Sequence, residues 1–265
     1  MSQAPTGEPE YVVEDTEHVR LIRINRPERM NALSRSLKVG LVEEFLRVKE
    51  DPRVRAMVLT GTGDRAFCAG ADLKEMSAND QAGTALRPPM DQPERSVIEV
   101  LSETFKPVIA ALNGHAVGGG CELALVSDIR IAAEGIHLSL PEARIGMGAV
   151  FGSVVLPKRI PLGIALEHLF TGDPITAKEA LRWGLVNRIV PRARLLDESM
   201  ELATRIAANA PITVRRMKEM AIKGLELPLW SAFRLDVGPN PYTSEDRKEG
   251  IRAFLEKRKP VWKNR

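Results

Sequence analysis

The sequence predicts an α/β fold, because apolar runs typical of buried strands alternate with helical patterns up to about residue 190, and helical patterns alone follow. The clearest runs are residues 54–60 and 107–112. Both are short and almost unbroken, as expected of strands that are buried on both faces. Three helices are expected after the alternating part, near residues 195–209, 214–225 and 244–258. We therefore expect an α/β core with a helical C-terminal extension.

The chain has 265 residues, which suffices for one large domain or for one domain with an appendage. We expect a disordered N-terminus at residues 1–9, a core at residues 10–195 and a helical C-terminal region at residues 196–265. The first seventeen residues are acidic and lack an apolar centre, so they do not resemble a secretory signal or a transit peptide. We accordingly expect a cytoplasmic protein.

The first elements expected are a hairpin and a helix. Apolar and polar residues alternate over residues 11–14 and 19–25, which predicts two antiparallel strands. Ser34 and Ser36 are the candidate caps of the helix that follows. Its apolar residues at helical spacing are Leu37, Leu41, Phe45 and Val48. Further along the chain we expect a helix at residues 96–105, strands at 129–133 and 137–139, and helices at 164–171 and 177–183.

Residues 106–128 place a strand, a glycine-rich turn and a helix in succession. The apolar run ends at Asn113, and three glycines at 118–120 precede a helical pattern. Glycine permits close approach, and the first N–H groups of a helix lack partners within the helix, so this arrangement can present backbone donors to an anion. Glu122 lies in the first turn, where the helix dipole favours a carboxylate. Tight helix packing and ordinary capping are the alternative interpretation of the same residues.

Residues 66–76 form a second segment at which the backbone can approach a ligand. The small residues Ala69, Gly70 and Ala71 precede Asp72, which could open a helix. Residues 80–95 are polar and contain three prolines, so we expect a mobile loop there. The earlier Gly-x-Gly at residues 61–63 has neither a third glycine nor a following helix pattern, which argues against a dinucleotide fingerprint.

The composition excludes several classes of protein. The formal charge is +3, from 38 basic and 35 acidic residues, which is too balanced for a general nucleic-acid binder. No apolar run approaches the length of a membrane span. Cys68 and Cys121 form neither a zinc motif nor a disulfide framework, which suits a reducing compartment. The four histidines show no ligand spacing, so we expect no metal.

Four motifs in this order give the chain a resemblance to the crotonase (enoyl-CoA hydratase/isomerase) family. They lie at residues 66–76, 113–128, 141–146 and 171–191 and read AFCAGADLKEM, NGHAVGGGCELALVSD, PEARIG and TGDPITAKEALRWGLVNRIVP. The resemblance runs from residue 24 to residue 260. It implies a spiral core of repeated ββα units, followed by C-terminal helices that form a homotrimer, which can pair into a hexamer. It also implies an acyl-CoA thioester as ligand, with no metal or other cofactor.

The resemblance assigns four residues to chemistry. The backbone N–H groups of Ala71 and Gly119 correspond to the family's oxyanion hole, which stabilises negative charge on a thioester oxygen. Glu122 and Glu142 correspond to the two glutamates of the family's hydratases. By this resemblance, Glu122 helps activate water for attack at Cβ, and Glu142 supplies a proton to Cα. The alternative for Glu142 is a surface residue paired with Arg144.

The resemblance also places several residues near CoA. Arg29 and Met30 flank the nucleotide end in relatives, and Lys257 belongs to a basic C-terminal cluster that could contact the phosphates. The remaining candidates lie in the same segment as Ala71. They are Ala69, Asp72, Leu73 and Lys74.

One segment departs from the family. Its hydratases follow the Pro-Glu motif with a Pro-Gly-x-Gly-Gly type loop, whereas residues 148–153 here read GAVFGS. Because of Val150 and Phe151, we expect this segment to form a bulkier wall of the substrate pocket. The alternative is that the segment only packs differently. The first hypothesis is therefore an enoyl-CoA hydratase, and the second is an enoyl-CoA isomerase or another enzyme with the same oxyanion hole. The third is a family member that binds a CoA thioester or RNA with little turnover, although the near-neutral charge argues against RNA.

Overall fold

The computed structural model describes residues 8–84 and 94–265, so most of the predicted disordered N-terminus and most of the predicted loop at 80–95 lie outside it. Its strands form two sheets. The six-stranded sheet has the order β1 (Tyr11–Thr16), β2 (Val19–Ile24), β3 (Ala56–Gly61), β5 (Val108–Leu112), β7 (Ile129–Ala133) and β10 (Arg188–Val190). The four-stranded sheet has the order β4 (Ala66–Cys68), β6 (His115–Val117), β8 (His137–Ser139) and β9 (Ile175–Thr176).

The chain passes repeatedly from the larger sheet to the smaller one. β3, β5 and β7 lie side by side and parallel in the six-stranded sheet, and the strands that follow them, β4, β6 and β8, lie parallel in the other. Parallel neighbouring strands need a crossover connection. Helix α2 (Leu73–Gln81) lies in the connection from β4 to β5, and helix α4 (Gly119–Val126) lies in the connection from β6 to β7. This repeat confirms the predicted ββα spiral.

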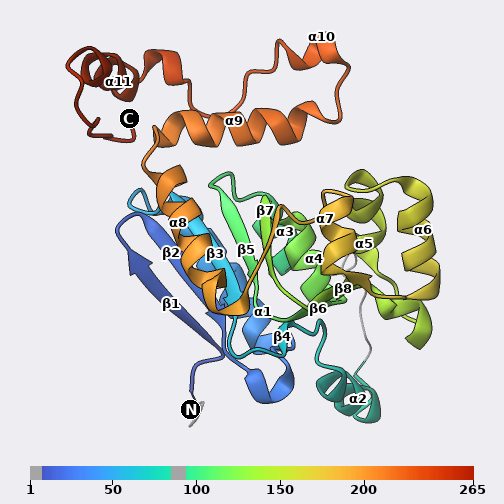
Figure 1. The fold of residues 1–265 in the computed structure, drawn as a ribbon. Coiled ribbons are helices and arrows are strands. Elements are labelled where there is room, and N and C mark those ends of the chain that lie inside the picture. The colour runs from blue at the N-terminus through green and yellow to red at the C-terminus, as the bar shows by residue number, and fades with distance from the viewer. Residues whose placement is uncertain (1–7, 85–93) are drawn as a thin grey trace.

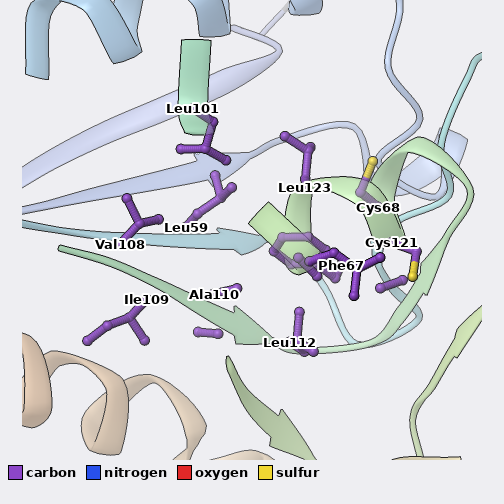
Figure 2. Close-up of a cluster of buried hydrophobic side chains, with 14 of the residues drawn as sticks. Leu59, Phe67, Cys68, Leu101, Val108, Ile109, Ala110, Leu112, Cys121 and Leu123 are labelled. Carbon is purple, nitrogen blue, oxygen red and sulfur yellow. The ribbon is translucent and has the colours of Figure 1, made fainter. Parts of the chain in front are cut away.

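The buried strands and the helices around them form the core. Every residue of β3 and β5 is buried, as their unbroken apolar sequences predict. Helix α8 (Leu195–Ala207) packs across β2, β3, β5 and β7, while α1 (Arg35–Glu50), α3 (Val97–Ser102) and α4 lie on the other side of this sheet (Figure 1). Figure 2 shows Leu101 of α3 and Leu123 of α4 in the buried cluster with Leu59 and Val108.

Local signals account for several element boundaries. The predicted hairpin is confirmed by the antiparallel pair β1 and β2. Ser34, rather than Ser36, caps α1, because its side chain accepts a hydrogen bond from the Leu37 N–H. The sequence did not predict strands β6 and β10, which have three residues each. It also did not predict helix α5 (Val150–Val155), which lies where a loop forming the pocket wall was expected. The later helices of the core are α6 (Leu162–Thr171) and α7 (Ala177–Arg182).

The predicted helical C-terminal region divides into two parts. Helix α8 belongs to the core packing, whereas α9 (Pro211–Gly224), α10 (Leu229–Ala232) and α11 (Glu245–Leu255) form an arm that extends away from the sheets (Figure 1). The arm is joined to the core by Lys218, whose Nζ lies 2.7 Å from Asp128 Oδ2 and donates to the Lys106 carbonyl. Within residues 8–84 and 94–265, no helix has the length and apolar character needed to span a membrane.

Candidate active site

The topology brings three of the four motifs to one edge of the smaller sheet. β4, β6 and β8 run parallel, so the residues that follow them emerge at the same edge. These residues are 69–72, 118–122 and 140–142. The candidate oxyanion donors and both candidate carboxylates therefore belong to three adjacent chain segments.

The Ala71 N–H is directed away from the neighbouring segment at Leu33. Leu33 forms an isolated parallel bridge with Ala71 and bonds the residues on either side of it. The Leu33 N–H donates to the Gly70 carbonyl at 2.7 Å, and the Asp72 N–H donates to the Leu33 carbonyl at 3.4 Å. Since backbone groups alternate in direction along an extended chain, the Ala71 N–H points to the opposite side.

Gly119 supplies a second N–H beside this segment. It is the first residue of α4, so its N–H lacks a partner within the helix. A Cβ on Gly70 would lie 3.0 Å from the Gly119 nitrogen, and a Cβ on Gly119 would lie 3.7 Å from the Gly70 Cα. The two backbones thus approach closely. Among the described residues, neither the Ala71 N–H nor the Gly119 N–H donates a hydrogen bond.

Two further glycines are required by this geometry. Gly118 has a φ of +54°, which disfavours L side chains. A Cβ on Gly120 would lie 2.0 Å from the Cys68 carbonyl oxygen, which no side chain could tolerate without a shift of the backbone. The glycine triplet is therefore needed both for the turn and for contact between α4 and β4.

Glu122 is held at one oxygen by the protein. It is buried, and its Oε1 accepts a hydrogen bond of 2.8 Å from the Gly152 N–H. Burial raises the pKa of Glu122, and the charge of Glu142 raises it further, although the Gly152 N–H acts in the opposite direction.

Glu142 lies on a short 3-10 helix, Pro141–Ile145, and faces the glycine turn. A Cβ on Gly118 would lie 3.0 Å from Glu142 Oε1. The other oxygen, Oε2, is buried and has no hydrogen-bond partner within the described part of the chain. Burial raises the pKa of Glu142. A partly buried carboxyl with an unpartnered oxygen and a raised pKa is suited to exchanging a proton.

The alternative role considered for Glu142 does not match the structure. Arg144 does not pair with Glu142. Its Nε donates to the Thr171 carbonyl at 2.7 Å, and its guanidinium forms an ion pair with Asp173. These contacts fix the short helix against the end of α6.

Sequence reasoning missed the role of Gly152. This residue lies in α5, and its N–H is the donor to Glu122. A Cβ on Gly152 would lie 2.7 Å from Leu140 Cδ1, so a larger residue here would have to displace the Leu140 side chain. The departure from the family loop at residues 148–153 therefore still provides a backbone contact to the carboxylate. No local signal links residues that are 30 positions apart.

The structure brings most of the CoA candidates together. The Ala69 N–H donates to the Met30 carbonyl at 3.0 Å, which places Arg29 and Met30 beside the start of α2. Leu73 and Lys74 are exposed in the first turn of α2. The Asp72 carboxylate has partners within the protein, because Oδ1 accepts from the Glu75 N–H and Oδ2 accepts from Arg26.

Lys257 is not brought to this group within a single chain. It follows α11 with a left-handed φ of +54°, in the arm that lies far from α2 in Figure 1. Across residues 8–84 and 94–265, no group of three or more His, Cys, Asp or Glu side chains could hold a metal ion.

Comparison with known proteins gives consistent results. The family model for enoyl-CoA hydratase/isomerase matches residues 14–265. The chain is 37% identical over 264 residues to (E)-benzylidenesuccinyl-CoA hydratase of Thauera aromatica, covering 95% of this chain and 98% of that protein. It is 39% identical over 254 residues to carnitinyl-CoA dehydratase of Salmonella paratyphi A, covering 92% of this chain and 94% of that protein.

Solved structures agree with these relatives. The crystal structure of an enoyl-CoA hydratase from Bacillus anthracis matches with a TM-score of 0.87 and 36% identity, covering 97% of this chain and 100% of that chain. An enoyl-CoA hydratase from Mycobacterium marinum matches with a TM-score of 0.86 and 33% identity over the same shares. The topology, the order of the motifs and these matches show that the chain has the crotonase fold and belongs to the enoyl-CoA hydratase/isomerase family.

Proposed function

We propose that this protein adds water across the 2,3 double bond of a 2-enoyl-CoA thioester and also catalyses the reverse dehydration. One observation supports this most strongly. Two glutamates with raised pKa values lie at the same sheet edge as two backbone N–H groups that have no partner among the described residues. Hydration of a conjugated thioester needs both features, because charge develops on the carbonyl oxygen while a proton is moved.

The backbone donors stabilise the charge. When water attacks Cβ, the electron pair of the double bond moves through Cα to the thioester oxygen. The N–H groups of Ala71 and Gly119 are the donors for this oxygen, and removing one such donor typically costs about 3 kcal/mol of transition-state stabilisation. The close approach of Gly70 to Gly119 supports a shared position for the oxygen.

The carboxylates manage the proton. Glu122 accepts a proton from the attacking water, whose oxygen bonds to Cβ, and Glu142 in its protonated form delivers a proton to Cα. One proton is taken and one is given, so the product is a 3-hydroxyacyl-CoA. Two nearby carboxyls that share one proton serve both steps, and their titrations are coupled. Water addition requires no external electron donor or acceptor, so we propose that coenzyme A enters only as part of the substrate.

The relatives favour water chemistry over a double-bond shift. Their names describe a hydratase and a dehydratase, which catalyse opposite directions of one type of reaction. Glu142, which the hydratase reaction requires as an acid, is present and faces the glycine turn. The two names also describe acyl groups of different kinds, an aryl-substituted one and a trimethylammonium one. We therefore propose 2-enoyl-CoA thioesters as the substrate class.

The test is turnover of a panel of 2-enoyl-CoA thioesters, followed by loss of the enoyl-thioester absorbance and by product analysis. The panel comprises crotonyl-CoA, longer straight-chain thioesters and an aryl-substituted thioester. We expect a 3-hydroxyacyl-CoA product from at least one member. A shifted double bond without a 3-hydroxy product would instead identify an isomerase. CoA binding without turnover of any member would contradict the enzymatic proposal.

We further propose that the arm assembles the protein into a homotrimer or a dimer of trimers. Its exposed apolar side chains support this, because large exposed patches usually mark interfaces. They form two groups at opposite ends of the arm (Figure 1), with Leu229, Trp230 and Phe233 at α10 and Phe254 and Leu255 in α11, and are 62–83% exposed. In such an assembly, Lys257 could reach a neighbour's CoA. Light scattering of the purified protein would test the assembly, and a monomer at micromolar concentration would contradict it.

A further inference from the structure

Arg26 joins the two chain segments that orient the Ala71 N–H. Its Nη1 donates to the Ala32 carbonyl at 2.5 Å, and its Nη2 donates to Asp72 Oδ2 at 3.1 Å. Ala32 directly precedes Leu33, and Asp72 directly follows Ala71. The guanidinium therefore spans the bridge between Leu33 and Ala71 and is bonded to both chains.

The ion pair is shielded from solvent. The side chains of Arg26 and Asp72 are 13% and 6% exposed. Burial alone would raise the pKa of Asp72, but the Glu75 N–H and the Arg26 guanidinium outweigh it and lower this pKa, so the carboxylate is charged at neutral pH. Removing one partner of a buried pair leaves the other charge uncompensated, so the local backbone is expected to rearrange.

Arg26 is itself fixed at its backbone. The Arg26 N–H donates to Asn31 Oδ1 at 3.0 Å, and Asn31 is fully buried. Asn31 Nδ2 donates in turn to the Ala66 carbonyl at 2.7 Å, at the start of β4. The Arg26 side chain is therefore bonded to both segments of the bridge, and the Arg26 backbone is connected to β4 through Asn31.

We propose that Arg26 is a positioning residue for the oxyanion hole. Through Ala32 and Asp72 it holds residue 71 in the orientation that aims its N–H at the thioester oxygen. The inference rests on the proposed function, because it assigns the Ala71 N–H to that oxygen. Arg26 acts through the backbone rather than on the substrate, so its loss should affect kcat more than KM. A misplacement of about 1 Å in an active site can cost about 100-fold in rate.

Three variants separate this role from a general contribution to stability. Arg26→Lys keeps the charge but cannot donate to two acceptors in a fork. Asp72→Asn keeps a capping side chain on α2 and removes only the charge of the pair. Arg20→Lys is the matched control, because Arg20 is also a buried, ion-paired arginine but its partners Asp15 and Glu44 lie outside the bridge.

Two readouts are needed. The first is kcat and KM for a 2-enoyl-CoA that the wild type hydrates. The second is the enolate fraction of bound acetoacetyl-CoA, measured by its ultraviolet absorbance, because an oxyanion hole favours the enolate whether or not hydration occurs. We expect Arg26→Lys to lower kcat by about 10- to 100-fold with little change in KM, and to lower the enolate fraction. Asp72→Asn should show a smaller effect in the same direction, and Arg20→Lys should match the wild type in kcat and in enolate fraction.

The outcomes are distinguishable. If Arg26→Lys lowers the melting temperature but keeps the wild-type kcat and enolate fraction, Arg26 only stabilises the fold and the inference is wrong. If Arg26→Lys does not fold, the kcat and the enolate fraction of Asp72→Asn are compared with those of the wild type, and unchanged values again show that the inference is wrong. If the wild type enolises acetoacetyl-CoA but hydrates nothing, the hydratase proposal fails while the enolate readout still tests Arg26. If the wild type does neither, both proposals fail.

Discussion

Glu122 lies in the first turn of α4 with one oxygen bonded to the Gly152 N–H, whereas Glu142 lies on a short 3-10 helix with one buried oxygen that has no partner among the described residues. Burial is the main cause of the raised pKa of both carboxyls. The difference lies in hydrogen bonding. A bonded oxygen fixes the orientation of Glu122, whereas an unpartnered oxygen leaves Glu142 a free position for a proton. We infer that two carboxyls whose pKa values are both raised by burial can have different roles when the backbone supplies a donor to only one of them.

The largest effect is expected from breaking the scaffold that positions both carboxylates. Gly120→Ala would place a Cβ 2.0 Å from the Cys68 carbonyl oxygen, which belongs to backbone in a buried strand. We expect a loss of about 3 kcal/mol of stability, the upper end of the usual cost of overpacking, because the clashing atom is backbone. We also expect a loss of activity. Thermal unfolding and turnover would measure this. The control is Gly163→Ala in α6, where a Cβ would meet nothing within 4 Å. Equal stability of the two variants would contradict the contact between α4 and β4.

Removing each carboxylate tests the comparison directly. Glu122→Ala and Glu142→Ala should each lower kcat by about 100-fold or more, as expected for loss of general acid–base catalysis. Their stabilities should differ. Glu122→Ala leaves the buried Gly152 N–H without its acceptor, at a cost of about 1–3 kcal/mol. Glu142→Ala removes a buried oxygen that lacks a partner, so its stability should equal or exceed that of the wild type.

Urea unfolding would measure the two free energies of unfolding, with the exposed Glu134→Ala as a reference. If Glu142→Ala is destabilised as much as Glu122→Ala, then Glu142 has a structural partner and the contrast between the two carboxylates is wrong.

A smaller effect is expected from displacing Glu142 without removing it. In Gly118→Ala, the new Cβ would lie 3.0 Å from Glu142 Oε1, at a residue with positive φ. We expect kcat to fall by about tenfold, in keeping with the sensitivity of catalysis to displacements below 1 Å. Gly135→Ala is the control for backbone strain, because Gly135 also has a positive φ but a Cβ there would meet nothing within 4 Å. If both variants keep the wild-type kcat, Glu142 does not depend on the glycine turn for its position.

The smallest effect expected is on the pH dependence of stability. The pKa of Glu142 is raised in the folded state above its ordinary value of 4.5, so the native protein binds this proton more tightly than the unfolded chain. The associated stability is present below pH 4.5 and is lost as pH rises through the raised native pKa. The difference in unfolding free energy between the wild type and Glu142→Gln should therefore shift against the wild type over this interval. Urea unfolding from pH 4 to pH 8 would measure it, and a difference that stays constant would contradict the raised pKa.

Much of the scaffold of the site follows from patterns within a few residues. The buried strands were predicted from unbroken apolar runs, the start of α1 from the two candidate capping serines Ser34 and Ser36, and the glycine turn from three consecutive glycines. The resemblance then placed Ala71, Gly119, Glu122 and Glu142 in the candidate site, and the topology brought their segments to one sheet edge. Short elements such as β6 were missed because three residues carry too little periodicity to be recognised.

By itself, the sequence determined the α/β core, the glycine turn and the position of Glu122 in a first helical turn, because each of these is recognised from the pattern of neighbouring residues in the chain. Only the tertiary structure decided that the Gly152 N–H bonds Glu122, that Arg26 bonds Asp72, and that one oxygen of Glu142 is left without a partner in the described residues. The first two contacts join residues that are 30 and 46 positions apart. Such contacts depend on how whole elements pack, and the packing sets the direction of each backbone N–H and the burial of each carboxylate. For this reason the residue types of the site could be read from the sequence, whereas their different environments could not.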